Sequence, residues 1–225
     1  MAEYETGKTT KQKILESAAS MFWQKGYSNT RYNDFARKYD INPGLIHYHY
    51  KKKRLLGEAT YLRIIEDTIQ NAKIIVGDDD DILLQYAIIT RIFWKYIEIS
   101  PEFSRFLRDI IIDRIAIKLS TREDLYWYRQ FNKKYELGIP DCEMDVQIIM
   151  AIAGELEFIL AYMNGDLDIA ADDCARLDIQ NTLRSMYFSD SIISHIIGAS
   201  ADLLEQYNIA MEKEFHAVIT KKRLK

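Results

Sequence analysis

The scarcity of helix-breaking residues is the feature that most constrains how this chain folds. Its 225 residues include nine Gly and three Pro, whereas all-β sandwiches and barrels need turn residues about every 8–12 positions. The sequence therefore predicts an all-α protein. Ile is abundant and Val is rare, with 32 and three copies. We interpret the Ile-rich runs as a compositional bias rather than as strands, and we give more weight to spacing.

Composition also limits the class of protein. Hydrophobic residues make up 48% of the chain and charged residues 28%, which supplies a core and argues against disorder. No uninterrupted apolar stretch approaches the length of a membrane span, and the first residues lack a signal-peptide core. We therefore expect a soluble, cytoplasmic protein that has no membrane partner. Cys142 and Cys174 lie outside any metal-ligand spacing, so we expect no metal site and no cofactor.

Charge is distributed unevenly along the chain. The overall net charge is −4, but residues 1–55 carry 11 Lys and Arg against five Asp and Glu, a net charge of +6. The remaining residues carry a net charge of −10. A small basic head on a large acidic body favours contact of the head alone with a polyanion.

Capping residues divide the head into three predicted helices. Thr9 begins a capping-box pattern for the first helix, and Thr30 is expected to cap a short second one. A break follows at Asp40, after which Asn42 caps a third helix with Pro43 in its first turn. Two short helices joined by a tight turn and supported by a preceding helix are typical of a helix-turn-helix unit.

The rest of the chain is also predicted to be helical, for a total of about nine to ten helices. The acidic run that ends at Asp81 is interpreted as a turn and helix cap rather than as a metal site. The sequence divides into a head over residues 1–56 and a helical body over residues 57–225. Apolar periodicity and caps place the remaining helices at about 53–76, 81–99, 101–119, 120–138, 143–163, 168–187 and 190–219.

Two of these helices are candidates for contact between subunits. The helix over 143–163 is apolar almost all round, so its own domain and a partner subunit are expected to bury it together. With the last helix it could form an intersubunit four-helix bundle, although both helices could instead complete the core of the monomer. The candidate interface residues are Ile149, Ile152, Leu156, Ile193, Ile197, Leu204, Tyr207 and Met211.

The head carries a spaced pattern that begins near Thr9 and ends at Leu56. Its positions are Ile14-Leu15, Ala18-Ala19, Phe22, Gly26-Tyr27, Thr30, Phe35-Ala36, Ile41-Asn42-Pro43-Gly44, Ile46, Tyr48-His49-Tyr50, Lys53 and Leu56. In this pattern the head resembles the DNA-binding domain of TetR/AcrR-type helix-turn-helix transcriptional regulators. Three positions depart from the family: Tyr39-Asp40 replaces the usual Ala-Gly, His47 replaces a Tyr, and Arg54 replaces an acidic residue.

The resemblance implies a ligand-responsive regulator, more often a repressor, in the bacterial cytoplasm and at the nucleoid when bound to DNA. Such a regulator binds a palindromic operator in double-stranded DNA as a homodimer, and a small-molecule effector binds in the body. The third helix is narrow enough for the major groove, and its exposed residues with the polar residues around it are the expected DNA contacts. These are Thr30, Arg31, Asn42, Pro43, Gly44, Leu45, His47, Tyr48, His49, Lys51, Lys52 and Lys53.

Aromatic residues of the body are candidates for the effector pocket. With acids nearby in the sequence at Glu98, Asp109, Asp113 and Glu123, they would suit an apolar or a cationic ligand. The candidate pocket residues are Phe93, Trp94, Tyr96, Phe103, Phe106, Tyr126, Trp127 and Phe131.

Two other functions are compatible with the sequence. A helical enzyme could use Glu155 and Glu157 as acid and base, but residues two apart on a helix face different directions. The basic head could also bind a protein or a membrane as part of an oligomerisation module. Binding to duplex DNA that depends on its sequence would separate the regulator from both.

Overall fold

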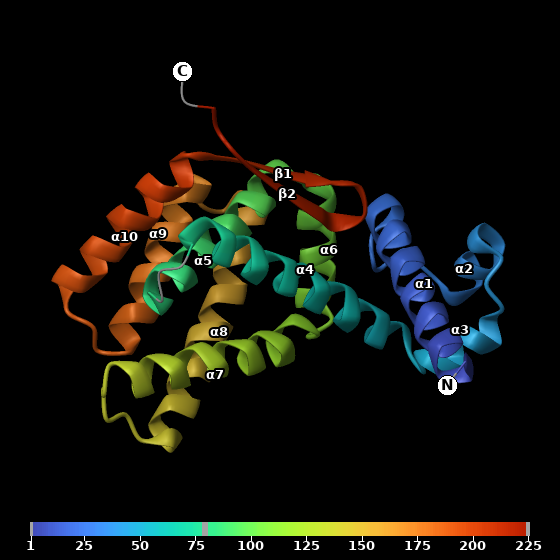
Figure 1. Cartoon of the computed structure of the whole chain (residues 1–225), viewed down its shortest axis with the longest axis horizontal. Helices are drawn as coiled ribbons and strands as arrows, with labels where there is room; N and C mark the ends of the chain where they lie inside the picture. The colour runs from blue at the N-terminus through green and yellow to red at the C-terminus, as the bar shows by residue number, and fades with distance from the viewer. Residues whose placement is uncertain (1, 78–80, 224–225) are drawn as a thin grey trace.

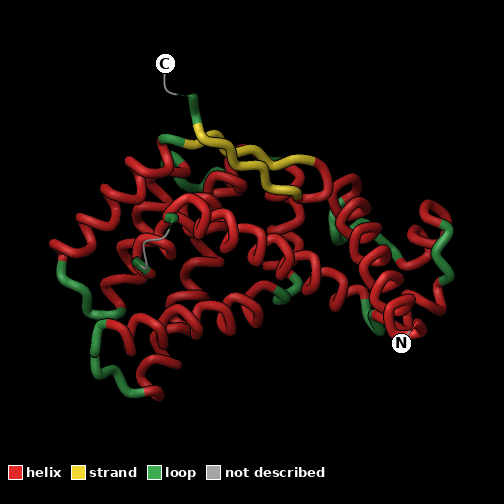
Figure 2. The backbone as a smooth tube through the Cα atoms, in the orientation of Figure 1, coloured by secondary structure: helices red, strands yellow, loops and turns green. Residues whose placement is uncertain are grey.

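A computed structural model describes the backbone of residues 2–77 and 81–223. Within these residues the chain forms ten helices and one two-stranded hairpin (Figures 1 and 2), so the predicted all-α class is confirmed with one local exception. The acidic residues Asp78–Asp80 lie outside the described residues. The helices are α1 (Ala2–Lys25), α2 (Tyr32–Tyr39), α3 (Pro43–His49), α4 (Lys53–Val76), α5 (Ile82–Ile99), α6 (Pro101–Ile112), α7 (Ala116–Lys134), α8 (Asp141–Asn164), α9 (Ala171–Ser185) and α10 (Asp190–Glu205), followed by strands β1 (Tyr207–Glu212) and β2 (His216–Lys221).

Helices α1, α2 and α3 form a head at one end of the molecule, and α4 connects it to the body (Figure 1). The predicted cap of α3 is confirmed, because the Asn42 side chain accepts a hydrogen bond from the backbone of Gly44. The turn between α2 and α3 places Asp40 in the left-handed region at φ 50°, which Asp tolerates better than most residues. The N-cap of α2 is Arg31 rather than the predicted Thr30. The Thr30 hydroxyl instead donates a hydrogen bond to the Gly26 carbonyl.

The body is built around α5, which contacts α4, α6, α7, α9 and α10. Ser100 and Pro101 begin α6 as predicted. The helix ends at Ile112 rather than near 119, because Arg114 adopts a left-handed φ of 54° and breaks the chain direction. The predicted helix start at Ser120 is therefore wrong, since that residue lies inside α7.

The prediction of a final helix to about 219 is also wrong. Helix α10 ends at Glu205, and β1 and β2 form an antiparallel hairpin that pairs Tyr207 with Lys221 and Glu212 with His216. Half-buried and exposed side chains alternate along β1, and a period of two residues belongs to a strand. The helix was predicted because Leu204, Tyr207, Met211, Phe215 and Val218 also recur every three or four positions, which is the spacing of a helix face.

The tip of the hairpin reaches from the body to the head (Figure 2). Phe215 is fully buried there, and its ring lies 5.2 Å from the ring of Trp23 in α1 and 4.9 Å from that of Phe106 in α6. The backbone of Glu214 and Phe215 has φ values of 64° and 63°. The chain therefore accepts a strained turn in order to place one aromatic ring between head and body.

Candidate functional sites

Helix α3 presents an exposed face that is held in place by buried residues. Ile46 is fully buried and Tyr50 is 5% exposed, so both anchor α3 to the rest of the head. On the opposite side Leu45 is 44% exposed and Tyr48 is 77% exposed. Large side chains left in solvent on a short, firmly anchored helix are available for contact with a partner.

The second helix fixes the position of one residue on this face. Tyr32 of α2 stacks on the imidazole of His47, with ring centroids 4.6 Å apart and planes at 15°. The Tyr32 hydroxyl donates to the Tyr50 carbonyl at 2.8 Å, which holds the tyrosine itself in place. His47, the position that departs from the family pattern, is therefore preoriented by its neighbours.

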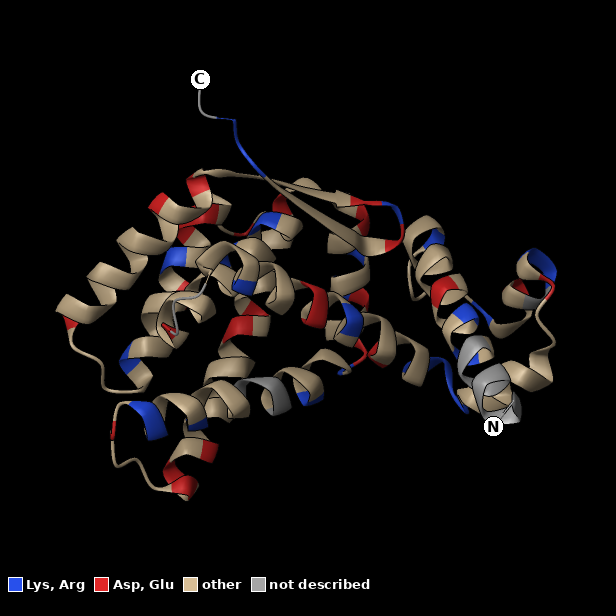
Figure 3. Cartoon of the chain, viewed as in Figure 1, with Lys and Arg blue, Asp and Glu red and all other residues tan. Residues whose placement is uncertain are grey.

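The basic residues around α3 differ in their availability. Arg31, Lys51 and Lys52 are exposed, and Figure 3 shows basic residues on the segment that leads into α4. By contrast, the Lys53 ammonium donates to the Tyr27 carbonyl at 3.0 Å and lies 4.2 Å from the centre of the Tyr27 ring. The side chain of Lys53 thus fastens the start of α4 to the head.

The predicted DNA contacts divide into residues that remain in solvent and residues that the head buries. Two predicted contacts are less available. Thr30 is 1% exposed and its hydroxyl already forms a hydrogen bond within the head, and His49 is half-buried. The exposed members of the predicted set are Arg31, Asn42, Pro43, Gly44, Leu45, His47, Tyr48, Lys51 and Lys52, which we define as the α3 surface.

The head is tied to the body through α6 as well as through α4. The Ser28 backbone N–H donates to the carboxylate of Asp109 at 2.7 Å, and the rings of Phe22 and Phe106 stack with centroids 5.7 Å apart. Gly57 lets α4 approach the head closely, because a Cβ there would lie 2.8 Å from the ring of Tyr27. A shift of α4 or α6 therefore moves the head.

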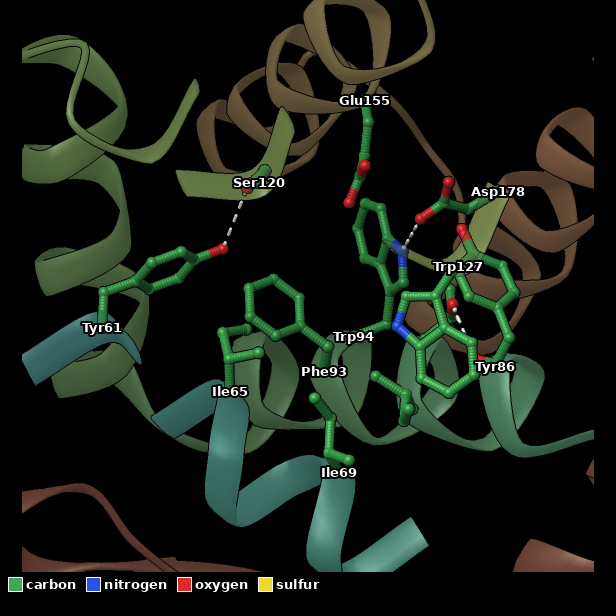
Figure 4. A pocket seen from close by; sticks show the side chains of 12 residues that line it. Tyr61, Ile65, Ile69, Tyr86, Phe93, Trp94, Ser120, Trp127, Glu155 and Asp178 are labelled. Carbon is green, nitrogen blue, oxygen red and sulfur yellow. Dashed lines mark hydrogen bonds between the residues drawn. The ribbon is translucent and has the colours of Figure 1, made fainter. Parts of the chain in front are cut away.

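A pocket lies in the body between α4, α5, α7, α8 and α9 (Figure 4). It contains about 630 Å³ that no protein atom fills, part of it open to solvent. Three of the predicted residues line it, namely Phe93, Trp94 and Trp127. The other lining residues are Tyr61, Ile65, Ile69, Tyr86, Ile89, Thr90, Ser120, Glu155 and Asp178.

The remaining predicted pocket residues lie elsewhere. Tyr126 is 58% exposed. None of the nearby acids Glu98, Asp109 and Asp113 lines the pocket, and the side chain of Glu123 lies outside the described residues. Four aromatic residues are buried in the core instead: Tyr96, Phe103, Phe106 and Phe131.

The deepest polar group of the pocket is one that the sequence reasoning missed. Asp178 of α9 is 6% exposed, and its Oδ2 accepts a hydrogen bond of 2.9 Å from the Trp94 indole N–H. Burial raises the pKa of this carboxyl to about 6, against a smaller lowering by the Trp94 hydrogen bond. No local sequence signal marks Asp178, because its neighbours in the pocket are distant in the chain.

The candidate interface residues fall into three environments. Ile152, Leu156 and Ile193 are buried in the described monomer, while Ile197 and Leu204 on α10 are half-buried. Tyr207 and Met211 lie on β1 instead of a helix and pack against the body. Of the predicted set, Ile149 is the residue that stands in solvent, at 58% exposed.

Helix α8 carries an exposed apolar face of its own. Val146 is 56% exposed and Met150 is 70% exposed, and with Ile149 they follow the helical spacing of a single face. By length and composition α8 is the one described helix that could cross a membrane, a test that core helices of soluble proteins also pass. Only 28% of its most apolar window is buried in the monomer.

In the described part of the chain, no group of three or more His, Cys, Asp or Glu side chains is arranged to hold a metal ion. His47 and His49 lie two residues apart on α3, so they point to different sides of the helix.

Comparison with known proteins identifies relatives of the head and of the fold. Residues 14–60 match the family model for bacterial regulatory proteins of the tetR family. A curated relative from Bacillus subtilis (strain 168), named "Probable HTH-type transcriptional regulator YttP", is 28% identical over 113 residues. That match covers 49% of this chain and 55% of the relative.

Solved structures extend the likeness to the body. The crystal structure of RolR in complex with resorcinol aligns with a TM-score of 0.60 at 13% identity, over 86% of this chain and 95% of RolR. TylP, a TetR regulator from Streptomyces fradiae, is 14% identical with a TM-score of 0.44, over 86% of this chain and 98% of TylP. The likeness to RolR establishes the fold of head and body together.

Proposed function

We propose that this chain, whose head matches the tetR family model over residues 14–60, is a helix-turn-helix transcriptional regulator of the TetR type that binds a palindromic operator as a homodimer and represses transcription until a small molecule enters its body. The observation that carries the proposal is the α3 surface. Its exposed Leu45 and Tyr48 stand on a helix anchored by buried Ile46 and Tyr50. Apolar contact to thymine methyls and hydrogen bonds to base edges are the contacts that such residues make in a major groove.

Two copies of the chain are needed for tight binding. Helix α3 has seven residues, and each base contact is worth about 1–3 kcal/mol of discrimination. A two-fold dimer doubles the contacts and places two α3 helices about 34–36 Å apart, or a multiple of that distance, on a palindrome. The exposed apolar face of α8 is the surface that we assign to the second subunit.

The position of the pocket suggests how a ligand could release DNA. Tyr61, Ile65 and Ile69 on its wall belong to α4, whose first turn is fastened to the head through Lys53 and Tyr27. A molecule that binds one position of α4 better than another shifts the population of head positions by that difference in affinity. RolR, which shares the fold, holds resorcinol, and this supports a small-molecule effector here.

Selection of random duplex DNA by the purified full-length chain tests the proposal. We expect the selected sequences to converge on a palindrome, with an affinity that falls steeply as salt is added because Lys and Arg displace counterions from phosphates. Sequences without a palindrome would contradict the two-fold dimer. Equal binding of selected and scrambled DNA would contradict the regulator and favour an oligomerisation module or an enzyme.

Tyr48→Ala is expected to weaken binding to the selected palindrome roughly 10- to 100-fold and to leave binding to scrambled DNA nearly unchanged. The reason is that Tyr48 is the most exposed large residue of α3 and lies where base edges are read. Fluorescence anisotropy with both DNAs measures the difference. Tyr126→Ala, at a tyrosine of the body that is 58% exposed, is the matched control and should change neither affinity.

Lys52→Ala provides the contrasting variant. We expect it to weaken binding to both DNAs by similar factors and to reduce the slope of the salt dependence by about one, because Lys52 contacts phosphate in our proposal. A loss for Tyr48→Ala that is equal on both DNAs would remove Tyr48 from sequence readout.

A further inference from the structure

The walls of the body pocket are aromatic. Trp94 and Phe93 from α5 and Trp127 from α7 surround the space together with Tyr61 and Tyr86 (Figure 4). The rings of Tyr86 and Trp127 lie 6.1 Å apart at 62°, so they present faces in different directions. Faces of electron-rich rings attract cations, and the attraction grows when the site excludes water.

Among the described residues that line the pocket, all the formal charge is negative. Glu155 and Asp178 are acidic, and none of the twelve described lining residues is Lys, Arg or His. Figure 4 shows the Glu155 carboxylate extending from α8 toward the space, on a different side from Asp178. An anionic ligand placed beside Asp178 would meet repulsion from its carboxylate.

Asp178 is a buried carboxylate that has a hydrogen bond but no ion-pair partner among the described residues. Its Oδ2 accepts from Trp94, and among the described residues no Lys, Arg or His forms an ion pair with it. Removing a carboxylate from water without a counter-charge is costly, and a neutral hydrogen bond offsets only part of the cost. The unliganded protein is thus less stable near pH 7 than it would be with a neutral group there.

From these observations we propose that the pocket selects a small cationic ligand, an ammonium group carried on an aromatic ring, whose charge binds Asp178 while its ring packs among the tryptophans. The proposal rests on the proposed function, in which this pocket receives the effector. The hydroxyl of Thr90, which also lines the pocket, is a further acceptor that the pocket offers to an ammonium N–H group. The ligand's positive charge supplies the counter-charge that the described residues do not give Asp178.

Three molecules of nearly equal size and different charge test the selectivity. Isothermal titration calorimetry of the full-length protein without DNA compares 2-phenylethylammonium, neutral 2-phenylethanol and anionic phenylacetate. We expect the ammonium compound to bind at least tenfold more tightly than the alcohol, and the phenylacetate not to bind. Equal or tighter binding of the alcohol or of the anion would overturn the proposal, as would the absence of binding by the ammonium compound.

Asp178→Asn separates a ligand-binding role from a structural one. The amide oxygen of Asn can still accept the hydrogen bond from the Trp94 N–H. If Asp178 had only a structural role, the substitution would leave the stability of the protein unchanged or lower it. We instead expect a rise of several degrees in the melting temperature of the unliganded protein at pH 7.5, together with a roughly 10- to 100-fold loss of ammonium affinity. Asp173→Asn, an exposed position on the same helix, should change neither property.

The rise in melting temperature expected for Asp178→Asn should disappear at acidic pH. The pKa of Asp178 in the folded protein, about 6, lies above the value near 3.9 expected for the unfolded chain. The native state therefore holds the proton more tightly, and the wild-type protein loses stability as pH increases from about 4 to about 6. The described titratable groups near Asp178 include Glu155 from α8 and Tyr86 from α5, which line the same pocket, and Cys174 from α9. Arg184 of α9 lines a second pocket together with Asp178, but its ion pair is with Asp190. A stability gain for Asp178→Asn that persists unchanged at pH 4 would contradict the assignment of an uncompensated charge.

The failure of this proposal can be told apart from failure of the proposed function. If the purified protein selects a palindrome but the neutral alcohol binds as well as the ammonium compound, the regulator stands and the charge selectivity falls. If no palindrome is selected while the ammonium compound binds in the expected order, the selectivity stands and the function as a DNA-binding regulator falls.

Discussion

Replacing Phe215 with alanine is expected to destabilise the protein by about 3–5 kcal/mol, the usual cost of removing a buried aromatic ring. The ring is fully buried and touches the head through Trp23 and the body through Phe106 and Phe103, with ring centroids 5.2, 4.9 and 6.5 Å away. Loss of the ring leaves a cavity at the junction of α1 and α6. We therefore expect α1 to separate more readily from the body.

Urea denaturation measures the loss of stability, and hydrogen exchange of the α1 amides measures the loosening of the head. Alanine has the same backbone strain as phenylalanine at a φ of 63°, so the change reports the ring and not the turn. Phe215→Leu, which refills most of the volume, should recover more than half of the loss. Val218→Ala, at a half-buried position of β2, is the matched control. A loss below about 1 kcal/mol for Phe215→Ala would mean that the hairpin tip does not join head to body.

The accuracy of the sequence analysis depended on how local each signal is. The start of α3 is specified locally, by a hydrogen bond from the Gly44 N–H to the Asn42 side chain two positions earlier and by the fixed φ of Pro43. The cap could therefore be predicted from these residues alone. The hairpin was missed because Tyr207, Met211 and Phe215 recur every four positions, which fits a helix. The alternation of Tyr207, Ile209 and Met211 with polar or small residues, which fits a strand, was present in the same segment. The hairpin turn contains no Gly or Pro that would mark it in the sequence. Its left-handed positions are occupied by Glu214 and Phe215 instead.

The pocket was only partly predictable for a different reason. Phe93, Trp94 and Trp127 line it, whereas Phe103 and Phe106 lie on the side of α6 that faces the head and its hairpin contact. Aromatic residues at helical spacing indicate a buried face without saying what lies opposite. Tyr61 and Asp178 enter the pocket only because α4 and α9 pack on α5, and such pairings are set by tertiary contacts that periodicity does not encode.

The second large effect is expected at the exposed face of α8. Ile149→Glu and Met150→Glu should convert a dimer into monomers, because each places a charge on an apolar surface that we assign to a partner subunit. Two glycines support this assignment. A Cβ at Gly154 of α8 or Gly198 of α10 would meet no atom within 4 Å, so the monomer gives no packing reason for the roughly 0.5–1 kcal/mol that a glycine costs inside a helix. Close approach of a second subunit would supply one.

Sedimentation velocity measures the dissociation, and titration of the selected palindrome measures its consequence. Since one head alone loses the gain from linking two sites, we expect operator affinity to fall roughly 100- to 10,000-fold while the melting curve of the monomer stays cooperative. Ile74→Glu, at a position of α4 that is 73% exposed, introduces the same charge away from the face and should leave the dimer intact. A dimer that persists in both α8 variants would assign the face to another occupant, and cosedimentation of the wild-type protein with phospholipid vesicles would then identify a membrane as that occupant. Because α3 contributes few contacts per subunit, disrupting α8 is expected to cost more operator affinity than any single substitution on the α3 surface.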